Sequence, residues 1–565
     1  MRGASSLFAL TASVIAAPPP LVVDLSGATS VATVFAVQVC AGLMNRDMSG
    51  QGVYTLMHAE DYSWLSLLEP DAAPAVSAPS FLATCFSSGA SRGYIRYNFS
   101  AQQEVVPNLA TLAALLDSVP LEDDSPFLPT AGSLVFDAVV AWDGFRALNA
   151  TEFMFTRFAN ATTTLAKMNP GWDVHDAPFG PWSLKYEPDL SLVDWIVKRR
   201  LFNFFLLEGC IPGTAEHALM ETIATANLWP RPIAVWGYDD TFSVAGDIFE
   251  AETTCVSEHN MGQIASVGVN NLAYFSRAPP LTSPLVSKVP RATYNSSKTY
   301  VAFVVGDGDN LAFVKGSRFD WLQQRLKECR TKPCFPLLWS MSPHLAWAAP
   351  NLLRAFYNQT LQTGMDAFIL PPSGHLYSYP GLMSPGDQAS FVATTEADAF
   401  ILNSSGSVEW EFVGTWGAAI ATYLPRYAAR GIVNFFVAVN VPYMLPVLEF
   451  AANEFFKLIG GSVVLFRPNE WRGTSGGSDP LQPFLPDAPT MAARVNSYPR
   501  GTVTQIYLTS DGGATLSDFF DLAALLDEHV QIVGDEVGAL AVAASKIIEV
   551  PSTPIVPTPS AESAY

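Results

Sequence analysis

The chain has 565 residues, which is too long for a single hydrophobic core and predicts about two to four domains. Apolar residues make up 49% of it, charged residues 15% and aromatic residues 12%, which excludes disordered and fibrous proteins because so much apolar material fills several cores. The net charge of −21 argues against nucleic acid as a partner, since such a field repels phosphate groups.

The first residues have the pattern of a secretory signal peptide. Arg2 provides a positive charge, residues 7–15 form a short apolar run, and Ala16 and Ala17 provide a cleavage site. A buried N-terminal helix is the alternative. No later segment reaches the roughly 20 uninterrupted apolar residues that a membrane span needs. The sequence therefore predicts removal of residues 1–17 and a secreted or cell-surface protein without a membrane span.

Cysteines and sequons agree with export. The six cysteines form an even set, as disulfides require, and Cys329 is close enough in sequence to Cys334 for a local bridge. Free, buried cysteine thiols are the alternative to disulfides. The sequence contains no CxxC spacing, which argues against a structural zinc site held by cysteines. Asn-x-Ser/Thr sequons offer glycan acceptors at Asn98, Asn149, Asn160, Asn295, Asn358 and Asn403.

The N-terminal half alternates between strand-like and helix-like segments. Strands at 21–25 and 53–57, each followed by a helical stretch, predict a small α/β domain over residues 18–110. Residues 111–297 are expected to form one or more further α/β domains. Their elements are buried strands and helices, predicted at 135–140, 233–236, 192–208 and 214–226. The sequence contains neither the glycine-rich nucleotide motifs nor HExxH, which argues against the commonest nucleotide-binding and zinc-protease classes.

The segment 298–549 has the pattern of a (β/α)₈ barrel. Eight short apolar strands alternate with helical stretches, among them 445–459, 516–526 and 538–548, over about 250 residues. The strands are expected at 300–305, 335–340, 366–370, 409–413, 433–439, 462–466, 503–508 and 530–533. An open doubly wound sheet is the alternative, because periodicity does not distinguish closed from open sheets. Residues 550–565 form a tail rich in Pro, Ser and Thr that is expected to be disordered.

Polar side chains follow several of these strands, where the active sites of parallel barrels lie. Asp307, Asp309 and Glu470 supply carboxyl groups, and glycoside hydrolysis requires two of them: one protonates the leaving oxygen, and the other acts as nucleophile or activates water. The sugar itself needs aromatic faces and polar partners. The residues predicted to supply these are Asn310, Trp339, His344, His375, Tyr377, Tyr379, Trp471 and Arg472.

Each of these residues also has a simpler interpretation. The run 306–310 has the composition of a turn or a metal-binding loop, and a metal ion held by Asp307 and Asp309 stays open, although Leu311 does not fit an EF-hand. Glu470 could pair with Arg472. The two histidines, at 344 and 375, could be hydrogen-bonding loop residues.

Residues 374–380, Gly-His-Leu-Tyr-Ser-Tyr-Pro, resemble the naming motif of the GxGYxYP family of putative glycoside hydrolases, with Leu376 in place of the second glycine. The run 303–310 resembles the family's apolar strand ending in S-D-G-D-N, with Gly306 in place of serine. Segments 338–343 and 471–473 are also similar. Near the N-terminus, 38–46 followed by 62–65 resembles the family's Q-G-L-V-N-R and W-L arrangement. The resemblance spans about residues 20 to 540 and implies N-terminal α/β domains before a C-terminal barrel.

Three functions follow as hypotheses. The first is a secreted glycoside hydrolase that acts on a polysaccharide or glycan through paired carboxylates, without a cofactor. The second is a carbohydrate-binding or cell-surface protein that performs no chemistry on its barrel. The third is a metal-dependent hydrolase or esterase with Asp307 and Asp309 as ligands. The sequence indicates neither the sugar nor the oligomeric state.

Overall fold

The computed structural model describes residues 18–27, 30–128, 130–171, 189–237, 248–286, 288–412, 414–441, 449–451, 453–473, 485–508 and 515–548. The predicted signal peptide and C-terminal tail lie outside the described residues. None of the helices in the described part of the chain is long and apolar enough to cross a membrane.

The first unit is a three-stranded parallel sheet with helices packed around it. Its strand order is β2-β1-β3, and the disulfide Cys40–Cys85 joins α1 to α3. The side chain of Ser30 caps α1 by accepting a hydrogen bond from the amide of Thr33. The elements are β1 (Leu21–Asp24), α1 (Val31–Met44), β2 (Val53–Leu56), α2 (Ala59–Leu68), β3 (Val76–Ser77) and α3 (Ala78–Ser87).

The second unit has its own parallel sheet, in the order β5-β4-β6. A domain boundary at residue 110 would fall inside α5 and would separate β4 from its two partner strands, so the boundary belongs before β4. A helix of apolar residues does not reveal from sequence alone which sheet it covers. The elements are β4 (Tyr94–Tyr97), α4 (Phe99–Gln102), η1 (Gln103–Val105), α5 (Val106–Leu116), β5 (Val119–Glu122), β6 (Leu134–Asp137) and α6 (Ala138–Ala141).

The third unit contains a four-stranded parallel sheet, in the order β10-β9-β7-β8. The helix predicted at 192–208 is too long. Arg200 takes a left-handed conformation (φ 53°) that ends α8, and the next residues form β8. The elements are α7 (Ala147–Phe158), η2 (Ala159–Ala161), β7 (Leu165–Lys167), α8 (Val193–Arg199), β8 (Phe202–Phe204), α9 (Ala215–Thr225), β9 (Ile233–Trp236), α10 (Ile248–Glu258), β10 (Met261–Ile264) and α11 (Leu272–Phe275).

The C-terminal part contains all eight predicted strands and two more, β16 and β18. Its strands are β11 (Thr299–Val305), β12 (Leu337–Ser340), β13 (Asp366–Ile369), β14 (Gly406–Phe412), β15 (Phe435–Val441), β16 (Phe456–Ile459), β17 (Val463–Phe466), β18 (Glu470–Trp471), β19 (Val503–Leu508) and β20 (Val530–Val533). Its helices are α12 (Leu311–Lys315), α13 (Ser317–Glu328), α14 (Leu345–Ala348), α15 (Pro350–Thr363), η3 (Pro380–Leu382), α16 (Pro385–Leu402), α17 (Trp416–Ala421), α18 (Leu424–Tyr427), α19 (Ala488–Asn496), α20 (Leu516–Ala524) and α21 (Val537–Ile548).

The predicted helix at 445–459 is wrong at its C-terminal end, where the chain forms β16, antiparallel to β17. Its earlier residues 445–448 and 452 lie outside the described residues. Phe456 and Leu458 point toward the same apolar cluster, a period of two that is characteristic of a strand. A run of four residues is too short for this period to stand out beside a helical one.

The α/β class is confirmed, but a closed (β/α)₈ barrel is not. The strands form a six-stranded sheet, β13-β12-β11-β19-β18 with β20 beside β11, and a four-stranded sheet, β14-β15-β17-β16. An isolated bridge between Leu370 and Ser407 connects them. In an eight-stranded ring the eighth strand would separate the seventh from the first, yet β19 pairs directly with β11. The other edge of β11 is shared, with β20 along its first half and β12 at its end.

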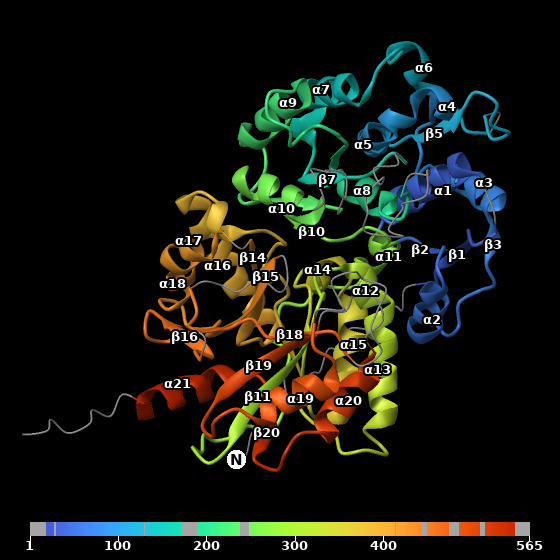
Figure 1. The fold of residues 1–565 in the computed structure, drawn as a ribbon. Helices are drawn as coiled ribbons and strands as arrows, with labels where there is room; N and C mark the ends of the chain where they lie inside the picture. Colours follow the sequence, from blue (N-terminus) through green and yellow to red (C-terminus); the bar gives the residue numbers. More distant parts are fainter. Residues whose placement is uncertain are drawn as a thin grey trace, which may run out of the picture.

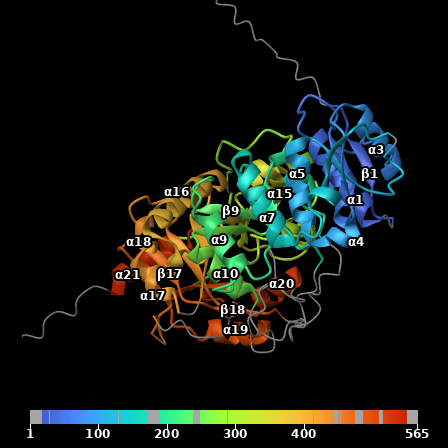
Figure 2. The same ribbon diagram turned by 90° about the horizontal axis from the view of Figure 1, so that it is seen from above.

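The inner faces of the two sheets pack on each other. Both contribute to one buried apolar cluster, which includes Tyr300, Val304, Leu338, Ile369, Val408, Val437, Val464 and Tyr507. The outer faces pack against helices such as α13 and α15, whereas α21 packs against the inner cluster through Val537, Leu540 and Ala541. Both Figure 1 and Figure 2 place the first unit (blue) and β14–β17 (orange) on opposite sides of the third unit (green), which lies against the C-terminal part.

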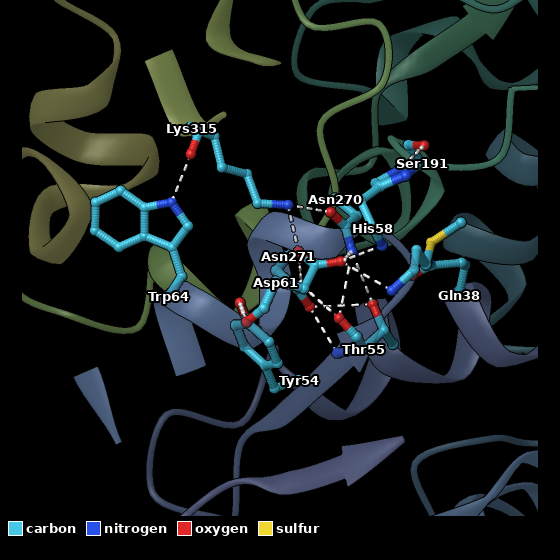
Figure 3. Close-up of polar contacts among 11 residues, drawn as sticks. Gln38, Tyr54, Thr55, His58, Asp61, Trp64, Ser191, Asn270, Asn271 and Lys315 are labelled. Atoms are coloured by element: carbon cyan, nitrogen blue, oxygen red, sulfur yellow. Dashed lines mark hydrogen bonds and ion pairs between the residues drawn. The ribbon is translucent and has the colours of Figure 1, made fainter. Parts of the chain in front are cut away.

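A buried polar network joins the first unit, the third unit and the C-terminal part (Figure 3). The ammonium group of Lys315 pairs with the carboxylate of Asp61 and donates to the side chain of Asn270. Burial alone would raise the pKa of Asp61, but the Lys315 charge and hydrogen bonds from nearby backbone amides leave it lowered. The indole of Trp64 donates to the carbonyl of Lys315 (2.7 Å). Part of the N-terminal resemblance, the segment containing Trp64, therefore lies at a junction between units.

Candidate active site

The acid loop, residues 306–310, follows β11 and is held close to its neighbouring strands. A Cβ on Gly308 would lie 1.8 Å from the carbonyl oxygen of Ser340, so only glycine permits this approach to β12. The amide of Gly308 donates to the hydroxyl of Ser340 (2.9 Å), which donates to the carbonyl of Val305 (2.8 Å). Asp307 takes a left-handed conformation (φ 57°). Non-glycine residues in this region are uncommon and concentrate at functional sites.

Two side chains hold the buried carboxylate of Asp307. The hydroxyl of Tyr507 donates to its Oδ1 (3.2 Å) and accepts from its backbone amide (3.2 Å). The guanidinium of Arg318 lies 3.5 Å from its Oδ2 and also donates to the carbonyl of Gly306 (3.2 Å). A divalent cation at Asp307 would have to share this carboxylate with the guanidinium, which disfavours the metal-binding interpretation.

Asp307 and Asp309 both interact electrostatically with the phenol of Tyr507. Burial raises the pKa of Tyr507 well above its usual value, and the charges of Asp307 and Asp309 raise it further. Tyr507 therefore stays protonated at physiological pH and remains a hydrogen-bond donor. Asp309 is half-buried, whereas Asp307 is buried. The two carboxylates thus lie near one hydroxyl group but differ in their access to solvent.

Glu470 reaches this end of the sheet through β18. In the parallel pairing of β18 with β19, Glu470 is the partner of Tyr507, and Tyr507 is in turn the partner of Val304 on β11. Partner residues on adjacent strands lie about 4.8 Å apart and point to the same face. Glu470 is half-buried. The structure therefore brings Asp307, Asp309 and Glu470 to one end of β11, β18 and β19.

Asn310 and Arg472 have structural partners. The side chain of Asn310 caps α12, accepting hydrogen bonds from the amides of Ala312 (3.0 Å) and Phe313 (3.3 Å). The Nε of Arg472 donates to the carbonyl of Leu485 (2.8 Å), so its guanidinium holds the chain beyond β18. Both residues flank the acids along the chain.

His344 and His375 lie together at the ends of β12 and β13. The Nε2 of His344 donates to the carbonyl of His375 (2.7 Å), and their rings are 4.9 Å apart. Burial lowers the pKa of His344 to about 3, so this ring is neutral at physiological pH. The Nδ1 of His375 lies 2.7 Å from the carboxylate of Asp398 on α16. Both rings have protein partners, as the simpler interpretation predicts.

The motif loop, residues 374–380, packs against the third unit. Its Tyr377 exchanges two backbone hydrogen bonds with Gln263 of β10 (2.8 and 2.9 Å). The backbone amide of Tyr379 donates a hydrogen bond to the hydroxyl of Ser257 on α10 (2.8 Å). Leu376 covers Gly262, where a Cβ would lie 2.6 Å from the Leu376 Cβ. The motif is thus a contact between the C-terminal part and the third unit.

The four aromatic side chains predicted to contact a sugar are buried in this structure. Trp339, Tyr377, Tyr379 and Trp471 are each no more than 5% exposed. Trp339 points outward to the helices and donates to Asp366 (2.9 Å), and Trp471 packs against Phe519 of α20. The sequence shows that rings follow the strands but does not show which face they occupy.

Sequence reasoning missed Tyr507, Arg318 and Trp410. Tyr507 sits within a strand, where an aromatic residue is ordinary, and Arg318 lies in α13, away from any strand end. Trp410 is half-buried, packs against the inner cluster, and contacts Tyr377 with ring centroids 5.4 Å apart. Its position two residues after the inward-facing Val408 is the signal that could have found it.

Two glutamates of β14 were also missed. Glu409 and Glu411 are buried on the opposite face of β14 from Trp410. Burial raises the pKa of Glu411 to about 8, against opposing hydrogen bonds from Thr415 and from the amide of Gly381, and it raises that of Glu409 well above its usual value. The hydroxyl of Tyr423 donates to Glu409 (2.5 Å). The burial of both glutamates, together with the hydrogen bond that Glu411 accepts from Gly381 just after the motif loop, indicates a structural role.

Comparison with solved structures shows the same fold elsewhere. A structure described as a putative hydrolase from Bacteroides thetaiotaomicron VPI-5482 superposes with a TM-score of 0.73 at 16% identity, over 94% of this chain and 95% of that one. A 4-alpha-glucanotransferase from Thermococcus litoralis (13% identity, 43% and 40% of the two chains) has a TM-score of only 0.29, which is too low to indicate a shared fold. No curated protein matches this chain.

A family model matches the segment that holds both loops. The matched segment begins just before β11 and ends at the first residue of β14, so it includes the acid loop and the motif loop but not Glu470. The resemblance seen in the sequence is confirmed over this segment: residues 297–406 match the model described as "GxGYxYP putative glycoside hydrolase C-terminal domain".

Proposed function

We propose that the protein is a secreted glycoside hydrolase whose active site lies at the ends of β11, β18 and β19. The observation that carries this proposal is that Asp307 and Asp309 both interact with Tyr507, whose partner on the adjacent strand is Glu470. The matched domain supports the reaction class, because its name specifies glycoside hydrolysis. The substrate would be a polysaccharide or glycan, and no cofactor is needed for this chemistry.

The three acids would have different roles. Asp309 and Glu470 are half-buried and so can reach a substrate, which makes them the proposed pair of general acid and nucleophile or base. Asp307 is buried between Tyr507 and Arg318 and would position the loop. Trp410, half-buried at the end of β14, is the ring that we propose for contact with a sugar.

Export rests on separate observations. All six cysteines are paired, in the disulfides Cys40–Cys85, Cys210–Cys255 and Cys329–Cys334. Disulfides persist in oxidising compartments, which supports a secreted or cell-surface location. The signal peptide at 1–17 and the glycan acceptors stay predictions of the sequence.

Glu470→Gln tests the proposal in a screen of polysaccharides and glycans for hydrolysis. Loss of a positioned acid or base typically slows a reaction about 10²–10⁴-fold, so we expect a loss in that range for Glu470→Gln on any substrate that the wild type cleaves. Its melting temperature should stay close to that of the wild type. Glu328→Gln is the matched control, because Glu328 pairs with Lys332 at the C-terminal end of α13, before β12 begins and so at the opposite end of the sheet.

Two outcomes would contradict the proposal. Full activity of Glu470→Gln would remove this residue from the chemistry. Equal binding of a glycan by the wild type and the variant, with hydrolysis by neither, would favour the carbohydrate-binding alternative instead.

A further inference from the structure

Two histidines and a glutamate gather on the third unit, on elements that the proposed glycosidic chemistry does not use. His217 and Glu221 lie one turn apart on α9, and His259 follows the end of α10. One ligand atom from each side chain lies within 4.8 Å of the other two. The Nε2 of His217 is 3.7 Å from the carboxylate of Glu221. We call this group the histidine cluster.

Backbone carbonyl groups fix both imidazole rings in the same tautomer. The Nδ1 of His217 lies 2.9 Å from the carbonyl oxygen of Gly209, and the Nδ1 of His259 lies 2.8 Å from that of Cys255. Because a carbonyl oxygen only accepts, each Nδ1 must carry the proton, and in the neutral ring the lone pair is then on Nε2. An Nδ1–H bond to a backbone carbonyl is the arrangement that orients metal-binding histidines in proteins.

A disulfide holds these two carbonyl groups in place. Cys210, which follows Gly209, is bonded to Cys255, whose own carbonyl orients His259. The backbone amide of His259 also donates to the Cys255 carbonyl (3.2 Å). At the other ring, the amide of His217 donates to the hydroxyl of Thr214, the N-cap of α9 (3.1 Å). Both rings are therefore supported by covalent and hydrogen-bonded structure independent of any ion.

We propose that His217, Glu221 and His259 bind one divalent transition-metal ion of the zinc class. Two imidazoles and one carboxylate are a ligand set that proteins use for zinc, whereas calcium and magnesium prefer oxygen ligands alone. Ligand atoms at about 2.0–2.2 Å from zinc would lie roughly 3.4 Å apart, so the side chains need only small rotations. Glu221 is 60% exposed, which gives it that freedom and leaves the remaining coordination position to solvent.

Such an ion would connect α9 to the end of α10, beside the disulfide that already joins the same two regions. It would be a second site of the protein, with nitrogen ligands, separate from the carboxylates around Tyr507. Its proposed role is to bind metal and stabilise the third unit, which holds whether or not the chain hydrolyses glycans.

The test is zinc binding to the full-length secreted protein after removal of bound metals by a chelator. We expect calorimetry with zinc chloride, and elemental analysis after dialysis, to give one zinc per chain. His217→Ala and His259→Ala should each weaken binding by at least about 10–100-fold, the typical effect of losing only a ligand's supporting hydrogen bond. Zinc should also raise the melting temperature of the wild type but not of these variants.

Glu221→Gln and His529→Ala complete the design. Glu221 is largely exposed, so Glu221→Gln should fold even if a histidine variant does not, and we expect it to weaken zinc binding at least about tenfold. His529→Ala removes a histidine outside the cluster and should bind as the wild type does. Absence of stoichiometric zinc from the wild type, or unchanged affinity in Glu221→Gln and in whichever histidine variants fold, would overturn the proposal.

Discussion

The acid loop and the motif loop follow neighbouring parts of one sheet, yet their surroundings differ. The acid loop, after β11, leaves Asp309 partly accessible beside the protonated Tyr507, and Glu470, the strand partner of Tyr507 on β18, is also partly accessible. The motif loop, after β13, buries both of its tyrosines and pairs with β10 of the third unit. Position at a strand end is therefore common to both, while access to solvent is not.

The two loops are therefore constrained in different ways: the motif loop by its contacts with the third unit, and the acid loop by the proposed chemistry. The motif loop joins two units and is constrained by several contacts: the amide of His375 donates to Thr395, that of Tyr377 to Gln263 and that of Tyr379 to Ser257. The loop that carries the proposed chemistry needs few fixed residues: glycines where strands approach closely, and carboxylates near a donor. We therefore expect substitutions in the motif loop to change stability, and substitutions around Tyr507 to change activity.

Leu376→Ala should give the largest change in stability. Leu376 is 1% exposed and packs against Gly262, so its truncation leaves a cavity between the motif loop and β10. We expect the free energy of unfolding to fall by about 2–5 kcal/mol in chemical denaturation. Leu525→Ala is the control, because the exposed Leu525 should contribute within about 0.5 kcal/mol. A change as small as the control's would contradict a structural role for the motif loop.

Glu411→Gln should alter how stability depends on pH. Because the pKa of Glu411 is raised to about 8, the folded state keeps a proton that the unfolded chain releases above about pH 4.5. This contribution is complete below the unfolded pKa and is lost as pH rises toward 8, at up to about 1.4 kcal/mol per pH unit. The variant should flatten that decline in denaturation measured from pH 5 to 8. Identical slopes in variant and wild type would show that Glu411 does not hold its proton.

Tyr507→Phe should have the smallest effect on stability but a measurable one on activity. It removes a hydroxyl that both donates to Asp307 and accepts from its amide, which should cost about 1–3 kcal/mol. We expect kcat to fall roughly tenfold, which corresponds to about 1.4 kcal/mol, because the acid loop loses its donor. Tyr294→Phe removes a hydrogen bond to the Gly501 carbonyl, near the start of β11, and should leave kcat unchanged. Equal kcat values in both variants would separate Tyr507 from the chemistry.

The sequence predicted the α/β class and the strands of the C-terminal part, because continuously apolar strands between helices are a strong local signal. It did not predict that β19 pairs directly with β11, since pairing depends on which strand edges meet in space. At the proposed site, the strand ends predicted Asp307, Asp309 and Glu470, which the structure places at one end of β11, β18 and β19. Trp339 was predicted on the wrong face of its strand. Side chains alternate between the two faces, and in a strand whose residues are all apolar the sequence does not show which alternate residues face inward.

The most direct test of the difference between the two loops is kcat for Asp309→Asn beside Leu376→Ala, each corrected for its folded fraction, on a glycan that the wild type cleaves. We predict a loss of about 10²–10⁴-fold in Asp309→Asn and a value near that of the wild type in Leu376→Ala. The reverse result, with Asp309→Asn active and Leu376→Ala folded but inactive, would place the chemistry at the motif loop and contradict the account.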